Sequence, residues 1–130
     1  MTIRSAIPPV LILLAIGSGF MCQPKKVSPT LIGKLAIDTS CGHFVIEVLQ
    51  GSIDGSKIVP EWKNPADDSL YINCFAVANF CDFPSNLFSK GDTFSFELDP
   101  HPAIQQCPIC FFNYPAPPVS NAVKDLHKLN

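Results

Sequence analysis

The chain has 130 residues, a formal net charge of −2, thirteen prolines, ten phenylalanines and six cysteines. A chain of this length predicts one domain, and its mildly acidic balance argues against a nucleic-acid partner, because phosphate binding needs a basic face. The prolines and phenylalanines predict a loop-rich domain with an aromatic core rather than a helical bundle.

The first 22 residues have the features of an export signal. Arg4 lies near the start, Ile7 to Ile16 is mainly apolar, and small residues follow at positions 17–19. The apolar stretch is shorter than the about 20 residues that a transmembrane helix needs. We therefore predict residues 1–22 to be a signal peptide. The mature protein is then expected in the periplasm or on the outer membrane, or otherwise secreted.

The signal ends in the sequence Gly19-Phe20-Met21-Cys22-Gln23. This stretch resembles the lipoprotein box of bacterial lipoproteins, in which the signal ends at a lipidated cysteine. Gly19 fits the pattern, whereas Met21 stands where the family has a small residue. The resemblance implies a lipid anchor at Cys22 that would attach the protein to a membrane. In the alternative, cleavage after Gly19 releases a soluble chain in which Cys22 is an ordinary cysteine.

Residues 23–30 are polar, contain two prolines and are predicted to be a tether, and residues 31–118 are predicted to form a β domain. Between residues 38 and 43, Gly42 predicts a hairpin turn, since glycine adopts the positive φ of tight turns. Residues 93–99 alternate between apolar and polar side chains, which indicates a strand with one solvated face. Runs rich in β-branched and aromatic residues predict strands at 35–37, 43–50, 58–59, 70–80, 93–99 and 111–114.

These short strands predict an all-β fold: a small OB-like barrel or a compact β-sandwich of five to seven strands. The C-terminal tail, residues 119–130, has a different pattern. Val119, Val123 and Leu126 recur at helical spacing behind Ser120, a suitable N-cap, so we expect a short C-terminal helix.

Cys107 and Cys110 form a C-x-x-C pair with three interpretations. A thioredoxin-like redox site needs a helix after the first cysteine, whereas a strand-like run follows here. A zinc site would combine the pair with Cys81 or Cys41, and His43 or His101 could contribute, but a second matched cysteine pair is missing.

The third interpretation, disulfide bonding, is favoured, because exported domains with small cores gain stability from cross-links. With Cys22 lipidated, Cys74 is expected to be unpaired in an apolar strand. Cys41, Cys81, Cys107 and Cys110 are then the disulfide candidates. Of the three possible pairings, we favour a link from Cys41 or Cys81 to the 107/110 pair. No cofactor is predicted.

Other motifs of catalysis are missing from the sequence. It has no G-x-S-x-G nucleophile elbow, no calcium-binding loop and no phosphate-binding glycine loop. Trp62, predicted to lie in a loop between Glu61 and Lys63, is the best candidate for contact with a partner protein, because exposed aromatic side chains often anchor partners.

Four segments of the chain carry a wider resemblance: residues 40–46, 79–83, 91–96 and 107–110. In these segments the chain is similar to small exported, often lipid-anchored bacterial envelope proteins of unknown function. The resemblance implies an envelope location and a cysteine-bearing β domain. The sequence therefore predicts a non-enzymatic exported protein whose disulfide-linked β domain binds a protein partner or has a structural role. The alternative is a zinc-binding or thiol-redox accessory protein that uses Cys107 and Cys110.

Overall fold

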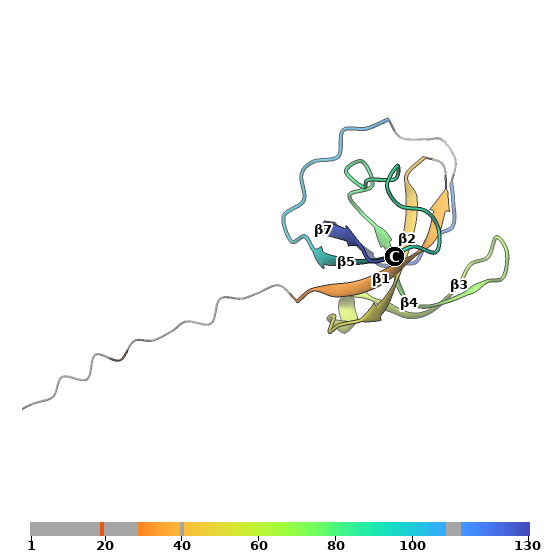
Figure 1. The fold of residues 1–130 in the computed structure, drawn as a ribbon. Coiled ribbons are helices and arrows are strands. Elements are labelled where there is room, and N and C mark those ends of the chain that lie inside the picture. Colours follow the sequence, from red (N-terminus) through yellow and green to blue (C-terminus); the bar gives the residue numbers. More distant parts are fainter. Residues whose placement is uncertain (1–18, 20–28, 40, 109–112) are drawn as a thin grey trace, which may run out of the picture.

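The computed structural model describes residue 19 and residues 29–39, 41–108 and 113–130 (Figure 1). The predicted signal peptide, most of the predicted tether, Cys22, Cys110 and half of the strand expected at 111–114 lie outside these residues. In the described part of the chain, no helix has the length and apolar character needed to cross a membrane.

The described residues form an all-β fold, as predicted, with a single turn of 3-10 helix. The elements are β1 (Leu31–Thr39), β2 (His43–Gln50), η1 (Gly55–Lys57), β3 (Val59–Lys63), β4 (Leu70–Val77), β5 (Thr93–Leu98), β6 (Ser120–Asn121) and β7 (Val123–Lys128). The prediction for β2 matches at both ends, and β5 ends one residue early. Asn113 and Tyr114, which were expected to be in a strand, are in a loop.

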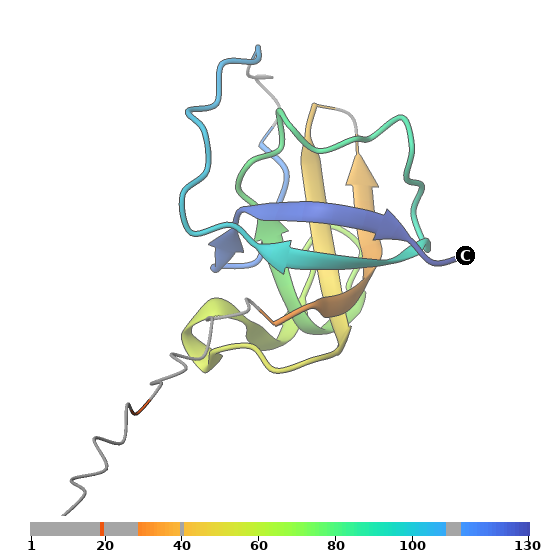
Figure 2. The same cartoon turned by 60° about the vertical axis from the view of Figure 1, so that its left-hand side comes forward.

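The strands form one sheet in the order β3-β4-β2-β1-β5-β7, in which neighbours are antiparallel, and β6 pairs in parallel with β4. The sheet is not closed into a barrel and is compatible with a β-sandwich. Strands β5 and β7 lie side by side and run across β1, β2 and β4 (Figure 2). Residues 120–128 therefore contact both β4 and β5.

The bend of the sheet lies in β1. Register shifts between Ile32 and Gly33 and between Leu35 and Ile37 interrupt its pairing with β2, and such bulges increase local twist and bending. The first half of β1 also pairs with β5. At the bend, a Cβ on Gly33 would lie 2.7 Å from Ile46 Cγ2 and 2.8 Å from Phe96 Cε1. Glycine is needed here because two packed side chains approach the backbone closely.

The predicted hairpin turn joins β1 to β2. Gly42 has a φ of 76° and Cys41 a φ of 74°, so the expectation of a positive φ at the glycine is confirmed. The turn places His43 opposite Thr39 and packs Gly42 against the Phe80 ring.

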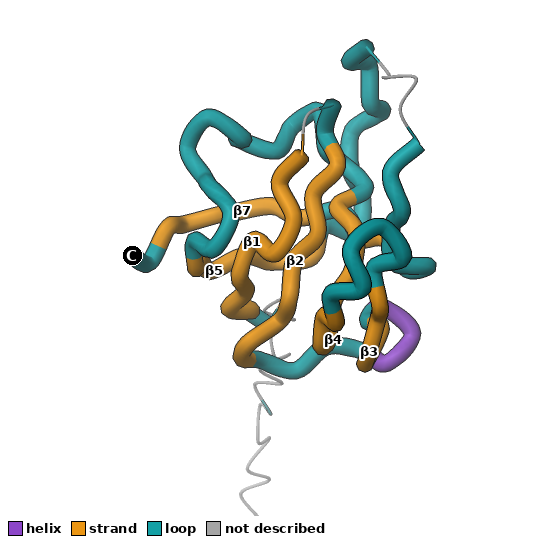
Figure 3. The backbone as a smooth tube through the Cα atoms, turned by 90° about the vertical axis from the view of Figure 1, so that its right-hand side faces the viewer, coloured by secondary structure: helices purple, strands orange, loops and turns teal. Residues whose placement is uncertain are grey.

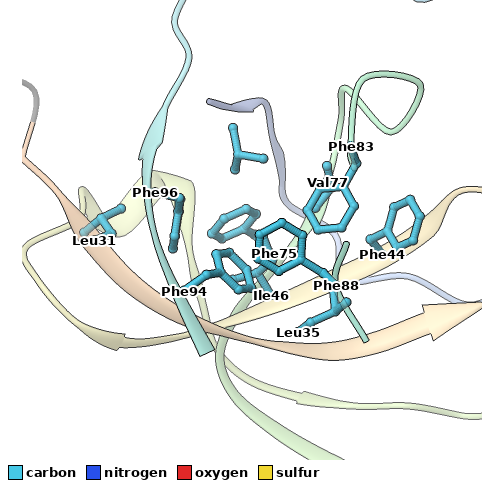
Figure 4. Packing of buried hydrophobic residues seen from close by; sticks show 11 residues of the cluster. Leu31, Leu35, Phe44, Ile46, Phe75, Val77, Phe83, Phe88, Phe94 and Phe96 are labelled. Carbon is cyan, nitrogen blue, oxygen red and sulfur yellow. The ribbon is translucent and has the colours of Figure 1, made fainter. Parts of the chain in front are cut away.

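The main core lies where β5 and β7 cross the rest of the sheet. It contains side chains that alternate along β2, β4 and β5, so the predicted alternation in β5 is confirmed: Phe94 and Phe96 are fully buried. The rings of Phe88 and Phe94 meet edge to face with their centroids 5.1 Å apart. Figure 4 shows this cluster, whose members are Leu31, Leu35, Phe44, Ile46, Phe75, Val77, Phe83, Phe88, Phe94, Phe96 and Val123.

The prediction of a C-terminal helix is wrong, because this tail forms β6 and β7. Ser120 pairs with Ala76 of β4 instead of capping a helix, and residues 123–128 pair with β5. Asp125 has a φ of 54°, which accompanies an irregular register in β7. This irregularity lets Val123 reach the core and Leu126 pack beside it. Pairing with the otherwise open edge of β5 outweighs a weak local preference for helix.

Asn79 links β7 to the end of β4. Its amide group donates to the Val123 carbonyl at 2.7 Å, and its Oδ1 accepts from the Val123 N–H at 2.9 Å. Both residues are buried. The side chain thus substitutes for a strand neighbour at the point where β7 begins.

We expect Asn79→Ala to lower the free energy of unfolding by about 1–3 kcal/mol, because it leaves a buried donor and a buried acceptor without partners. Urea unfolding would measure the loss, and faster amide exchange at Val123 would locate it. Exposed Asn86→Ala is the matched control. A loss no larger than that of the control would mean that water replaces both hydrogen bonds.

Candidate functional site

Three of the four disulfide candidates are oxidised. Cys81 and Cys107 form a disulfide across 26 residues, with their Cα atoms 5.6 Å apart, and Cys41 is also disulfide-bonded. Cys110 lies outside the described residues. The Cys81–Cys107 bond agrees with the predicted link to the 107/110 pair, and Cys74 is unpaired and buried, as expected.

The cysteine region acts as a cross-link in this structure. Zinc binds cysteine as a thiolate, whereas Cys41, Cys81 and Cys107 are in disulfides. The described residues contain no group of three or more His, Cys, Asp or Glu side chains that could hold a metal. The Gln105 side chain adds a second tie, since its Oε1 accepts from the Cys81 N–H at 2.8 Å and its Nε2 donates to Asp82 at 3.2 Å. The long segment between β5 and β6 is thus attached to the loop after β4.

Cys74 belongs to a second, smaller apolar cluster on the other face of the sheet. Ile37, Val45 and Cys74 are its buried members. Burial raises the pKa of the Cys74 thiol to about 11, and the nearby Glu47 carboxylate adds to the rise. At neutral pH this thiol is therefore protonated and acts as a small apolar side chain.

Trp62 packs against the same cluster, so the expectation of a loop position is wrong. It lies in β3, which extends past the strand predicted at 58–59 and through Pro60, because proline is tolerated at the edge of a sheet. Trp62 is half-buried, and its ring stacks on Tyr71 with the centroids 5.7 Å apart. Its proposed contact with a partner stays a prediction. In the structure the Trp62 ring packs against one face of the Tyr71 ring and holds that ring in its orientation.

Tyr71 lines a pocket of about 260 Å³. The pocket is on the face of the sheet that carries the second cluster, which we call the outer face. The pocket lies on the side of β1 and β2 opposite the main core. The register shift between Leu35 and Ile37 turns Ile37 away from that core and into the second cluster, and His43 alternates with the core residue Phe44. Three separate segments complete its walls: the loop between β3 and β4, the loop before β5, and the segment after the cysteine pair. The lining residues are Ile37, Thr39, His43, Asn64, Ala66, Asp67, Tyr71, Lys90, Tyr114 and Pro115.

The loop between β3 and β4 is fixed by its own hydrogen bonds. The Asn64 N–H donates to the Ser69 carbonyl at 2.8 Å, and the Asn64 carbonyl accepts from the Asp68 N–H at 2.8 Å. The Asn64 side chain accepts from the Ala66 N–H at 3.0 Å, and Asp67 accepts from the Ser69 N–H at 3.0 Å. Figure 3 shows β3 and β4 side by side at one edge of the sheet. These bonds hold Ala66 and Asp67 at the pocket.

His43 and Tyr114 form the opposite wall. Their rings stack with an interplanar angle of 3° and centroids 5.6 Å apart. The His43 side chain also hydrogen-bonds the backbone of Pro115, whose carbonyl is its only backbone acceptor. Burial lowers the pKa of His43, and the bond to Pro115 opposes this effect only in part. The imidazole is thus neutral at pH 7, and its ring fixes the segment at 114–115 against the sheet.

Backbone hydrogen bonds between β1 and the residues just before β5 fix the position of Lys90. The Gly91 N–H donates to the Leu35 carbonyl at 2.8 Å, and the Leu35 N–H donates to the Asp92 carbonyl at 3.0 Å. Gly91 has a φ of 94°, a conformation that favours glycine. This pairing brings the loop that contains Lys90 beside Leu35 of β1, and Lys90 lines the same pocket as Ile37.

Most polar groups of the pocket already have partners within the chain. Thr39 donates to the His43 carbonyl, and Asn64 is committed to its own loop. Aromatic and aliphatic surface therefore dominates the walls, and Asp67 and Lys90 supply one charge of each sign. Such a site can bind a flat or elongated group by burying its apolar surface, and the two charges can fix the orientation of that group.

Sequence reasoning missed this pocket, although it had noted several of its residues. The sequence places residues 64–69 between the strands predicted at 58–59 and 70–80, and it places His43 at the start of the strand predicted at 43–50. The Asn-Pro-Ala and Asp-Asp-Ser patterns indicate side chains that bond their own backbone, which could have predicted a rigid loop. No local signal shows that this loop faces His43 and Tyr114.

The lowered pKa of His43 predicts a pH dependence of stability. Above pH 6.5, the reference value, the ring is neutral in both folded and unfolded chains. Below it the unfolded chain binds a proton first, so stability falls as the pH decreases from 6.5 toward the folded pKa. Urea unfolding at pH 7.5 and 5.5 should show a smaller loss for His43→Gln than for the wild type. Exposed His127→Gln is the control and should keep the wild-type loss, whereas an equal loss in both variants would contradict the assignment.

Comparisons with family models, with curated proteins and with solved structures found no match to this chain.

Proposed function

We propose that this protein is a non-enzymatic, exported cell-envelope protein whose disulfide-linked β domain binds a partner protein in the pocket on its outer face. The features of an export signal in residues 1–22 support export, and the disulfide at Cys81 and Cys107 suits an oxidising compartment. The resemblance of residues 19–23 to a lipoprotein box supports attachment to a membrane through Cys22. Without the anchor, the protein would be periplasmic or secreted.

The observation that carries the proposal is the construction of the pocket. Its walls come from segments far apart in the chain, and hydrogen bonds, a ring stack and strand pairing hold each of them. A binding site formed before its ligand arrives loses less conformational entropy on binding. Tyrosine and tryptophan are enriched among the residues that dominate binding energy, and here Tyr71 is supported by Trp62.

The pocket suits binding rather than catalysis. Among the described lining residues, Thr39 has the only aliphatic hydroxyl, and it donates to the His43 carbonyl rather than to the ring. His43 is bonded to Pro115, so the hydroxyl and the imidazole do not form a nucleophile–base pair. The sole unpaired cysteine among the described residues, Cys74, is buried and protonated.

The binding proposal can be tested with a displayed library of random peptides selected on the purified, oxidised protein. We expect the selected peptides to lose about tenfold or more in affinity for Tyr71→Ala and for His43→Ala, as measured by fluorescence anisotropy, because hot-spot truncations cost about 2 kcal/mol or more. Trp62→Phe should have a smaller effect, because it keeps a ring behind Tyr71.

Leu49→Ala is the matched control, since Leu49 is 52% exposed and does not line the pocket. Circular dichroism would verify that each variant folds. Peptides whose affinity depends on Leu49 and not on Tyr71 or His43 would contradict the proposed site, as would a selection that enriches no peptide above a blank surface.

The envelope location needs a separate measurement. We expect the native protein to fractionate with membranes and its intact mass to correspond to a chain that begins at Cys22 and carries acyl groups. A lipid-free mass that begins after Gly19 would instead assign it to the periplasm or the medium. A mass that retains residues 1–22 would exclude processing of the predicted signal.

A further inference from the structure

The pocket combines aromatic rings with one carboxylate. His43, Tyr71 and Tyr114 contribute rings, and Asp67 lies among the same lining residues. The face of an aromatic ring carries a partial negative charge that attracts cations. A neighbouring carboxylate strengthens this attraction and provides a hydrogen-bond acceptor. The chemistry of the walls therefore favours a positively charged group that is flat enough to lie against rings.

We infer that the pocket takes an arginine side chain of the partner protein, with its guanidinium among the rings of Tyr71, His43 and Tyr114 and hydrogen-bonded to Asp67. This inference rests on the proposed function and names the chemistry of the group that is recognised.

Guanidinium fits these walls better than ammonium does. It is planar, stacks on aromatic faces and is more weakly hydrated than the ammonium group of lysine. A pocket of about 260 Å³ accepts one long side chain rather than a whole peptide segment. The stack of Trp62 on Tyr71 holds the Tyr71 ring from behind, so its orientation does not depend on the ligand.

Asp67 has an oxygen available for this contact. Its Oδ1 accepts from the Ser69 N–H at 3.0 Å, which leaves Oδ2 for a guanidinium N–H. The neighbouring carboxylate, Asp68, lies 3.7 Å from Lys63 in a salt bridge, so Asp67 is the carboxylate directed to the pocket. The neutral state of His43 removes a like charge from the wall.

Lys90 indicates which kind of residue lies next to the arginine in the partner protein. It lines the pocket and makes no salt bridge with a described residue. Its exposed ammonium would attract an anion beside the bound arginine. The partner segment therefore presents an acidic residue next to its arginine.

NMR titration of the isotope-labelled, oxidised protein tests the inference with three dipeptide probes: N-acetyl-Arg-Asp-amide, N-acetyl-citrulline-Asp-amide and N-acetyl-Arg-Asn-amide. Citrulline has nearly the same shape as arginine but no charge. We expect the Arg-Asp probe to shift the amide signals of His43, Asp67 and Tyr71. It should bind about tenfold more tightly than the citrulline probe, in line with a partly desolvated cation–π contact and a charge-assisted hydrogen bond.

Two variants separate the charges. Asp67→Asn should reduce the preference for arginine over citrulline to about twofold, since the substituted amide keeps a hydrogen-bond acceptor but removes the charge that strengthens the contact. Lys90→Gln should weaken the binding of the Arg-Asp probe but not that of the Arg-Asn probe. Asp68→Asn is the matched control and should leave the arginine preference unchanged.

Equal affinity for the arginine and citrulline probes would overturn the inference, as would an arginine preference that survives Asp67→Asn. In either case the proposed function stands if peptides selected from the library still depend on Tyr71 and His43. If those peptides also fail to require the pocket, both proposals fall.

Discussion

Replacing both Cys81 and Cys107 by serine is expected to lower the free energy of unfolding by about 3.5 kcal/mol, the loop-entropy value for a cross-link that closes about 26 residues. This loss is a large part of the total stability of a typical domain, about 5–15 kcal/mol. Urea unfolding under non-reducing conditions, followed by the fluorescence of Trp62, would measure it.

The effect of this cross-link should also reach the pocket. Cys107 lies seven residues before Tyr114 in the chain, and the disulfide attaches this segment to the loop after β4. In the double variant we expect weaker stacking of Tyr114 on His43, visible as shifts of their ring proton signals. Cys74→Ala is the control, because it removes a cysteine without touching a disulfide. If the double variant were as stable as Cys74→Ala, the bond would not constrain the unfolded chain as the entropy argument requires.

Phe75→Ala should destabilise the domain by about 3–5 kcal/mol, the range for a buried phenylalanine whose removal leaves a cavity. Phe75 is fully buried, and its ring centroid lies 6.0 Å from that of Phe96, which belongs to β5 (Figure 4). Its loss therefore removes contacts between the two crossing parts of the sheet.

Thermal and urea unfolding of Phe75→Ala and of the control Leu87→Ala would test this prediction. Leu87 is 64% exposed, so its truncation should change stability by less than about 0.5 kcal/mol. Similar losses in the two variants would contradict the assignment of Phe75 to the main core.

Local patterns predicted much of the sheet correctly for identifiable reasons. Alternation in residues 93–99 predicts a one-sided strand, and Phe94 and Phe96 are buried as it requires. Gly42 predicts a turn because its backbone conformation is a local property. The free, buried state of Cys74 follows from its apolar neighbours. In each case the deciding interaction is between residues close in the sequence.

The predictions from sequence were wrong where pairing with a distant segment determines the local structure. The helical spacing of Val123 and Leu126 predicts a helix, but Val123 pairs with Leu98 of β5, which lies 25 positions earlier in the chain. Trp62 follows a proline and was placed in a loop, but the edge position of β3 tolerates Pro60 and puts the indole against Tyr71. Neither the open edge of β5 nor the edge position of β3 can be recognised from a short window of sequence.

The sequence by itself determined the all-β class, the hairpin at Gly42, the aromatic core and a disulfide that includes the 107/110 pair. These features depend on composition, alternation and turn chemistry. The tertiary structure alone decided that the β3–β4 loop, His43, Lys90 and Tyr114 surround one pocket. The reason is physical: the bend of β1 and the cross-link at Cys81 bring together segments whose separation in the chain leaves no local signal.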